Sequence, residues 1–368
     1  MRRLRLACVV GARPNFMKIA PIHAVLRDHP RLEPYLVHTG QHYDEAMKDA
    51  FFRQLGIPEP DVDLEVGSGT HAWQTAQIMQ RFEPVLDEVK PAAVLVVGDV
   101  NSTIACGLVA AKKQVPLIHV EAGLRSGDRT MPEEINRILT DQLSDLLFTT
   151  EKAAEANLRR EGIAPERIHF VGNVMIDALL AHLERAEPAA RTLARFGHDL
   201  PEDYAVLTLH RPANVDDSDV LSRLLTVLAE ISCRLPLVFP CHPRTAARIE
   251  GFGLQSRLRE ANVAVLPPLG YLEMLGLVKD ARLVLTDSGG LQEETTALGV
   301  PCLTLRDNTE RPVTVTEGTN TIVGRDPERI RACVADVLET GGKRGRIPAL
   351  WDGKAAERIV SIIDEWFP

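Results

Sequence analysis

Short apolar segments alternate with helix-forming segments along most of this chain, and that alternation constrains the fold more than any other feature. In the first half, strands are expected at Leu4–Val10, Tyr35–His38, Ala93–Val97, Leu117–Val120, Leu146–Phe148 and Ile168–Val171. In the second half, they are expected at Ala205–Leu209, Leu237–Phe239, Val263–Leu266, Leu283–Leu285 and Cys302–Leu305. Strands that alternate with helices are typical of a parallel sheet covered by helices on both faces. The pattern therefore predicts an α/β protein.

The length of the chain indicates two domains. Its 368 residues are too many for one ordinary domain and suit two of moderate size. We predict two Rossmann-like domains facing a cleft, residues 1–173 and 174–350, and a C-terminal helix in residues 351–368 that packs back on them. Residues 186–201, which mix Pro, Ala, Arg and Gly, are interpreted as a linker region. Parallel sheets bind ligands at the carboxyl ends of their strands, so the residues after each strand are the candidates for chemistry.

Composition and charge narrow the range of partners. A net charge of -9 argues against nucleic acid or an anionic membrane as the main partner. No apolar segment is long enough to span a membrane. The six cysteines are scattered without a C-x-x-C pair, and we interpret them as buried free thiols of a cytoplasmic protein.

A strand, a glycine turn and a helix follow one another in residues 282–312, and this unit is the strongest single motif. The turn is Ser288-Gly289-Gly290. The two glycines let the backbone approach a ligand closely, and the amides of the first helical turn have no internal partners, so they suit a phosphate. An unoccupied strand-to-helix turn is the alternative.

Two further residues point from an anion to a nucleotide. Glu293 and Glu294 are neighbours on the helix, so their side chains point about 100° apart and only one can face the pocket at the turn. We predict that it is Glu294, whose carboxylate can accept hydrogen bonds from both hydroxyls of a ribose. Arg311 can bring a fixed cationic fork to a diphosphate. A surface arginine is the alternative.

Acidic residues follow the strands of the first half. Asp99 and Glu121 come after two successive strands, and Glu133 opens the helix that follows. Crowded carboxylates in a closing cleft raise the pKa of at least one of them, which leaves a proton donor beside a base. His210, after the first strand of the second half, titrates near neutrality. Each of these residues has a helix cap, a sheet edge or the surface as its alternative.

Several familiar reaction types lack their motifs here. The turn at Gly11 is not G-x-G-x-x-G, and no G-K-[ST] phosphate loop is present. No tyrosine has a lysine four residues later, which removes the Tyr-Lys pair of oxidising sugar epimerases. The histidines do not form H-E-x-x-H, and His119-Val120-Glu121 has no later P-C-x-x-C. We therefore predict acid–base chemistry on a nucleotide-linked substrate, without a metal or a cofactor.

Taken together, the motifs of the chain resemble those of the non-hydrolysing UDP-N-acetylglucosamine 2-epimerase family. They are GARPNFMKIAPI, TGQHYD, VVGDVNST, HVEAGLRSGDRTMPEEINR, LHRPANVDD, PPLGYLEML, TDSGGLQEE and TERP. The resemblance implies a two-domain glycosyltransferase-B architecture and the interconversion of UDP-N-acetylglucosamine and UDP-N-acetylmannosamine. In this reaction UDP leaves carbon 1 while a base takes the carbon 2 proton, and UDP returns as a proton is added on the other face.

The resemblance also implies roles for individual residues. Asp99, Glu121 and Glu133 would be the acidic catalytic residues, and His210 would serve near the diphosphate and the reacting sugar. The implied contacts to UDP come from Arg13, Ser288, Gly289, Gly290, Glu294 and Arg311, with Lys18 nearby and Leu269 and Met274 bordering the uracil.

Some members of the family use a second UDP-sugar as an activator, and this chain differs from them in part. The residues of such a site that remain are Gln41, His42, Arg211 and His242. Asp44 and Trp73 stand where those members have a Gln and an Arg, so activation is expected to be altered or absent.

Other functions remain open at this point. One is a 2-epimerase of a related UDP-diacetamido-uronic acid, and another is a hydrolysing 2-epimerase that releases UDP. A glycosyltransferase of the same fold and a non-catalytic nucleotide-sugar sensor complete the set. The resemblance also implies a homodimer and a product that feeds polysaccharide synthesis.

Overall fold

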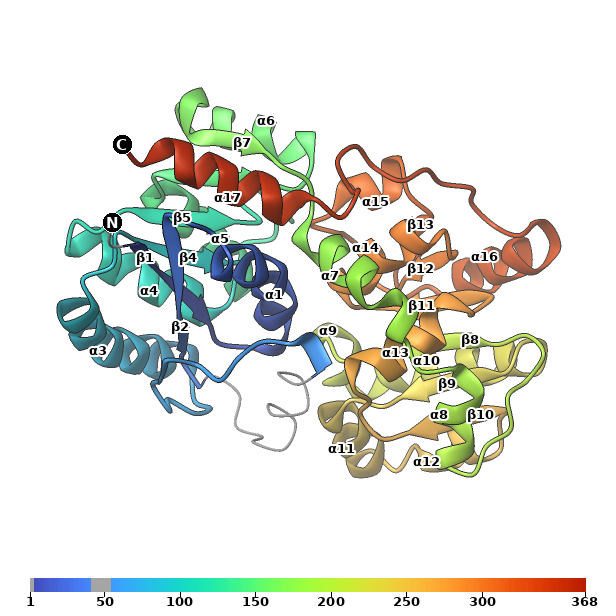
Figure 1. Ribbon diagram of the computed structural model, residues 1–368. Helices are drawn as coiled ribbons and strands as arrows, with labels where there is room; N and C mark the ends of the chain where they lie inside the picture. Colours follow the sequence, from blue (N-terminus) through green and yellow to red (C-terminus); the bar gives the residue numbers. More distant parts are fainter. Residues whose placement is uncertain (1–2, 41–53) are drawn as a thin grey trace. The chain divides into compact units, whose positions relative to one another are not determined.

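The computed structural model describes residues 3–40 and 54–368, with the side chain of Arg13 excepted. It contains two compact units, Met1–Ala181 with Ala349–Pro368, and His182–Pro348 (Figure 1). Each unit holds one parallel sheet with helices around it. The predicted α/β class with two Rossmann-like units is confirmed.

The sheet of the first unit is doubly wound around a switch in strand order. Its strands, in spatial order, are β3 (Val62–Asp63), β2 (Leu32–His38), β1 (Leu4–Val10), β4 (Ala93–Val97), β5 (Leu117–Val120), β6 (Leu146–Thr149) and β7 (Ile168–Phe170). All paired strands are parallel. The order reverses between β1 and β4, and ligands bind at such a point because the connections on either side of it leave to opposite faces.

Helices cover both faces of this sheet. They are α1 (Arg13–Arg27), α3 (His71–Val89), α4 (Asn101–Lys112), α5 (Pro132–Leu143), α6 (Lys152–Arg160), α7 (Val174–His182) and α17 (Ala355–Trp366). Alternate residues of β1 and β4, including Val9 and Val96, form one core with α3 and α4. The last helix, α17, packs beside α1 (Figure 1). Its first backbone amides, of Ala355 and Ala356, donate to the Asp177 carboxylate at 3.2 and 2.7 Å, which caps the helix.

The second unit repeats the plan with another switch point. Its strand order is β10 (Val263–Leu266), β9 (Leu237–Pro240), β8 (Ala205–Thr208), β11 (Leu283–Thr286), β12 (Cys302–Thr304) and β13 (Asn320–Ile322). The order reverses between β8 and β11. Neighbouring residues of these strands enter different cores, because side chains alternate across a sheet. Leu207 and Leu285 pack in one core, and Val206 and Val284 in the other.

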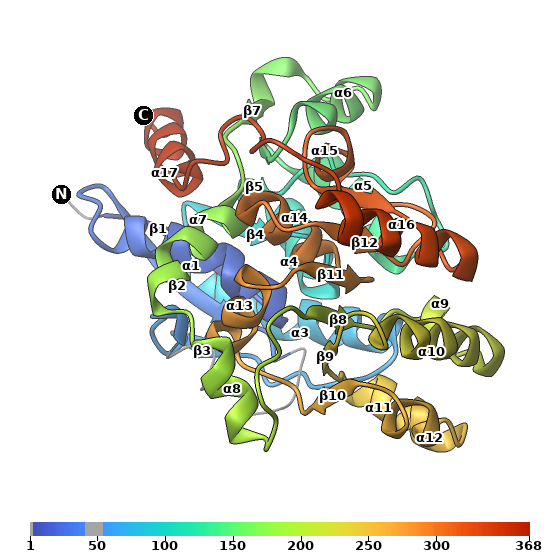
Figure 2. The ribbon, with the colours of Figure 1, turned by 90° about the vertical axis from the view of Figure 1, so that its right-hand side faces the viewer.

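Each core of the second unit has its own helices. The first is built with α10 (Ser218–Ser232), α11 (Pro243–Gly251), α12 (Gln255–Arg259) and α16 (Pro327–Thr340). The second is built with α8 (Ala189–Arg195), α13 (Tyr271–Lys279) and α14 (Gly289–Leu298). Figure 2 shows α8 and α13 on one side of the strands, and α10 and α16 on the other. The unit also contains the short helices α9 (Pro212–Val215) and α15 (Pro312–Thr316).

Three details differ from the expectations. The linker expected at 186–201 contains α8, whose Ala189 and Leu193 are buried, because two apolar residues four apart share one helix face. The edge strands β3 and β13 were not predicted, since they are too short for a visible apolar alternation. Cys233 is exposed and Cys333 is only partly buried, whereas the cysteines were expected to be buried. Within residues 3–40 and 54–368, no helix is both long and apolar enough to cross a membrane.

Candidate functional site

The ends of β4 and β5 bring two of the predicted catalytic residues to one edge of the first sheet. The Gly98 amide donates to the Val120 carbonyl at 3.0 Å, so the pairing of the strands continues to the residues just before Asp99 and Glu121. Lys18 of α1 reaches the same edge, since a Cβ atom added at Gly98 would lie 2.7 Å from its Nζ. The segments that follow β1 and β4, the two strands at the switch point, therefore meet at this edge of the sheet.

Lys18 forms a buried ion pair with Glu121. Its Nζ lies 2.7 Å from Oε1 of the carboxylate, and the two side chains are 4% and 2% exposed. Glu121 has a φ of +72°, which a residue other than glycine rarely adopts. Strain of this kind persists where the surroundings hold it, and it is concentrated at functional sites. Lys18, expected near UDP, thus contacts the carboxylate that was expected to react.

Arg137 of α5 holds Asp99 and Glu134 together. Its Nη1 donates to the Asp99 carboxylate, and its Nη2 donates to Oε2 of Glu134 at 2.7 Å. Burial opposes the ionisation of Glu134, but the Ser126 amide and the Arg137 guanidinium bring its pKa below the ordinary value. Glu133, half-buried, lies in the first turn of the same helix, where the helix dipole favours a carboxylate. Arg137 and Glu134 were not predicted as site residues, because only the fold reveals their burial.

At the glycine turn of the second unit, the Arg311 guanidinium lies close to the start of α14. Ser288 is the N-cap residue of this helix. A Cβ atom added at Gly289 would lie 2.5 Å from Nη1 of Arg311, so the absence of a side chain lets the guanidinium lie against the first turn. A guanidinium beside unpaired helix amides is a suitable arrangement for phosphate oxygens.

Carboxylates fix the orientation of Arg311. Its Nε lies 2.9 Å from Glu293, and its Nη1 lies 2.6 Å from Glu310. Glu310 also receives Arg306 at 2.7 Å. Burial disfavours the charged form of Glu310, but Arg311 and Arg306 outweigh it and hold the pKa of that carboxyl well below its usual range. The charges in this network are balanced, so it positions a guanidinium rather than supplying a large excess of positive charge.

Glu294 lies in a different environment from its neighbour Glu293. Burial, reinforced by the negative charge of Glu293, raises the pKa of Glu294 to about 8, while the Tyr271 hydroxyl acts in the opposite direction. The two glutamates thus have different partners, in agreement with their angular separation on the helix. A carboxyl with this pKa changes its charge near neutral pH. Its capacity to accept hydrogen bonds changes with that charge.

Asp287 connects the two loops at the switch point of the second sheet. Its carboxylate lies 2.7 Å from Nδ1 of His210 and accepts hydrogen bonds from the Arg211 amide and the Asn214 side chain at 2.9 and 3.1 Å. Burial works against its charge, yet the His210 ring and the backbone amides lower the pKa of Asp287. This carboxylate orients the His210 ring through its contact with Nδ1. Asp287 was missed because its partners are distant in sequence.

The remaining predicted residues have varied surroundings. Leu269 belongs to the core beneath α13, and Met274 packs against that core. Arg211 lies 3.7 Å from Glu310, and the ring of His242 lies 5.9 Å from that of His210. Trp73 is 45% exposed at the start of α3. Gln41, His42 and Asp44 fall outside the described residues.

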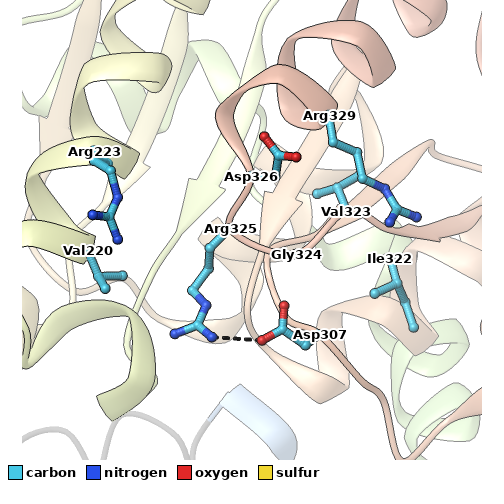
Figure 3. Close-up of a pocket in the computed structure, with 9 residues that line it drawn as sticks. All are labelled: Val220, Arg223, Asp307, Ile322, Val323, Gly324, Arg325, Asp326 and Arg329. Atoms are coloured by element: carbon cyan, nitrogen blue, oxygen red, sulfur yellow. Dashed lines mark hydrogen bonds and ion pairs between the residues drawn. The ribbon is translucent and has the colours of Figure 1, made fainter.

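A cavity of about 480 Å³ lies elsewhere in the second unit (Figure 3). Arg223 of α10 and Arg329 of α16 contribute to its walls. Between them, Arg325 forms an ion pair with Asp307 at 2.7 Å. Among the residues that the structure describes, none of the predicted site residues lines this cavity.

Comparison with known proteins decides the family. The sequence model described as UDP-N-acetylglucosamine 2-epimerase matches residues 24–364. This chain belongs to that family. A UDP-N-acetylglucosamine 2-epimerase from Methanococcus maripaludis is 42% identical over 365 residues, which are 98% of each chain. The predicted membership of the UDP-N-acetylglucosamine 2-epimerase family is confirmed.

Two further relatives are named for the nucleotide sugars that they bind or convert. The crystal structure of Methanocaldococcus jannaschii UDP-GlcNAc 2-epimerase in complex with UDP-GlcNAc and UDP matches with a TM-score of 0.91 and 42% identity, covering 98% of this chain and 100% of that one. A UDP-2,3-diacetamido-2,3-dideoxy-D-glucuronate 2-epimerase from Pseudomonas aeruginosa is 43% identical over 98% of this chain and 99% of its own.

Proposed function

We infer that this protein converts UDP-N-acetylglucosamine to UDP-N-acetylmannosamine, and the reverse, without a cofactor. The observation that carries this inference is the whole-length likeness, at 42% identity, to an epimerase whose structure holds UDP-GlcNAc and UDP. The likeness includes both units and is not confined to one motif. It favours an isomerase of the non-hydrolysing kind.

We assign the nucleotide to the second unit. The amides at the start of α14 and the Arg311 guanidinium receive the diphosphate, because both present hydrogen-bond donors at Gly289. Glu294 accepts the ribose hydroxyls once it is ionised. Leu269 and Met274 offer an apolar border to the uracil.

We assign the proton transfers to the first unit. The carbon 2 hydrogen is not beside a carbonyl, so its removal requires the departure of UDP from carbon 1. A base breaks the carbon 2–hydrogen bond while the carbon 1–oxygen bond breaks, which leaves a double bond between the two carbons. Return of UDP and protonation on the opposite face complete the epimerisation. Asp99, Glu121 and Glu133 are the proposed acid–base groups, and His210 assists at the leaving diphosphate.

Product analysis in heavy water tests this proposal. The purified protein is incubated with UDP-N-acetylglucosamine alone, and the nucleotide sugars are separated by chromatography. We expect UDP-N-acetylmannosamine with deuterium at carbon 2. Product without solvent label would contradict the mechanism, and free sugar with UDP would indicate a hydrolysing enzyme. Adding a second UDP-sugar to the assay measures activation.

A second substrate deserves the same assay because of the Pseudomonas aeruginosa relative. That protein is as similar to this chain as the UDP-N-acetylglucosamine 2-epimerases are. We expect kcat/KM to be higher for UDP-N-acetylglucosamine than for the diacetamido-glucuronate nucleotide. The reverse order would reassign the substrate and retain the reaction. The homodimer is a separate proposal that sedimentation equilibrium tests.

A further inference from the structure

A buried histidine lies directly behind the predicted acid–base residues, and the mechanism above gives it no role. His119 of β5 is 0% exposed. Its Nε2 lies 2.8 Å from the carbonyl oxygen of Gly98, and its Nδ1 lies 2.7 Å from Oδ1 of Asp141. Both ring nitrogens are therefore engaged, one with the backbone before Asp99 and one with α5.

The hydrogens of this pair follow from the chemistry of its partners. A carbonyl oxygen only accepts, so Nε2 carries a hydrogen and donates it to Gly98. Since Nδ1 faces a carboxylate oxygen, a second hydrogen lies between the ring and Asp141. In a site with no solvent exposure, loss of either bond would leave a buried polar group unsatisfied.

Asp141 extends the connection to the segment that carries Glu121. Its second oxygen, Oδ2, accepts a hydrogen bond from the Gly123 amide at 3.1 Å. The same oxygen lies 2.7 Å from Nη2 of Arg125. Gly98, His119, Asp141 and Gly123 thus form one hydrogen-bonded chain, which we call the His119 brace.

The brace joins both segments that end in predicted catalytic carboxylates. Asp99 directly follows Gly98, and Glu121 precedes Gly123 by two residues. Asp141 lies four residues after Arg137 on α5, and residues at this spacing share a helix face. The same face of α5 therefore holds the Asp99 side chain through Arg137, and it holds the preceding Gly98 carbonyl through Asp141 and His119.

We propose that His119 and Asp141 are positioning residues that fix the separation of Asp99 and Glu121 during the proton transfers at carbon 2. This inference rests on the proposed function. His119 touches neither substrate nor the reacting atoms, and it acts through the Gly98 peptide. A displacement of about 1 Å in reacting groups lowers rates by about 100-fold, and this is the scale of loss expected when the brace is broken.

Matched substitutions separate positioning from simple loss of structure. His119→Ala removes both bonds, and we expect kcat to fall by about 100-fold. In Asp141→Asn, the amide can donate to Nδ1 of His119 while its oxygen still accepts from Gly123, so we expect a smaller loss of kcat than in His119→Ala. Asp141→Leu keeps the size but no hydrogen bond, and we expect it to match His119→Ala. His119→Gln, which can still donate to Gly98, is the second variant should His119→Ala fail to fold.

The readouts keep this inference distinct from the function on which it rests. The wild-type protein must epimerise UDP-N-acetylglucosamine, and failure there overturns the proposed function. For the variants, UDP affinity should stay within about threefold of wild type, because the UDP contacts assigned to Gly289, Glu294 and Arg311 lie in the other unit. Hydrogen exchange of peptides 97–104 and 118–126, which needs no substrate, should become faster in Asp141→Leu and not in Asp141→Asn. A folded His119→Ala protein with wild-type kcat, a folded His119→Gln protein whose kcat falls as far as that of Asp141→Leu, or equal kcat losses in Asp141→Asn and Asp141→Leu, would overturn the brace.

Discussion

In the first unit, Lys18 pairs with Glu121 and Arg137 with Asp99, whereas in the second unit two carboxylates, Glu293 and Glu294, are buried next to one another. Both arrangements lie at the carboxyl edge of a doubly wound sheet. In the first, each carboxylate contacts one cation on a neighbouring helix. The second leaves one carboxyl with a pKa near 8. We propose that the first arrangement moves protons and that the second holds an anion and two hydroxyls.

The substitution with the largest expected effect lies in the first unit and tests whether that unit carries out the proton transfers. Glu121→Gln keeps the shape of the side chain but removes a charge from the pair with Lys18. We expect kcat to fall by about 100- to 10,000-fold, the range that acid–base groups supply. UDP affinity, measured by calorimetry, should remain close to wild type. Strongly weakened UDP binding with a normal kcat would reverse the assignment of the two units.

A glycine substitution tests the division from the second unit. Gly289→Ala places a Cβ atom 2.5 Å from Nη1 of Arg311 and must displace the guanidinium. We expect the Kd for UDP to rise by about 10-fold, as the loss of one charge-assisted hydrogen bond of about 1.5 kcal/mol implies. Gly251→Ala on α11 is the matched control, because no atom lies within 4 Å of its added Cβ. Equal effects of the two changes would refute the role of the close contact.

The pKa of Glu294 gives a test that depends on pH. A folded-state pKa of about 8 exceeds the ordinary glutamate value of 4.5, so the folded protein binds more protons than the unfolded chain between these values. Stability is therefore expected to decline as the pH rises from about 4.5 through about 8. Glu294→Gln should remove this decline, and at pH 9 it should therefore unfold at a higher urea concentration than the wild type.

Binding should show the opposite trend. The ionised form of Glu294 accepts two hydrogen bonds, so UDP affinity of the wild type should rise with pH and level off above about 8, as the pKa predicts. Glu294→Gln should bind UDP more weakly at pH 9 and vary less with pH. An unchanged pH profile in Glu294→Gln would show that another group controls binding.

The two regions also differ in how much of them could be predicted from the sequence. The strand β11, the turn and α14 are contiguous in the chain, so their residue types alone indicated an anion site. Arg137, Asp141 and Asp287 take their roles from partners on other elements, and nothing local in the sequence reveals those partners. The same holds for α8, whose Pro- and Gly-containing neighbourhood resembled a linker until Ala189 and Leu193 were found in the core. A motif of contiguous residues could be predicted from the sequence, whereas contacts between residues distant in the sequence could be identified only from the structure.

The smallest expected effect concerns a contact that serves neither site. Asp177 caps α17 through the amides of Ala355 and Ala356, and burial raises the pKa of its carboxyl. Asp177→Ala should cost about 1 kcal/mol, the usual value of an N-cap, and lower Tm by a few degrees with kcat unchanged. Asp177→Asn retains an accepting oxygen, so its stability should lie between those of the wild type and Asp177→Ala. A fall in kcat beyond the loss of folded protein would mean that α17 communicates with the acid–base residues, and the separation between structural and reactive carboxylates in the first unit would need revision.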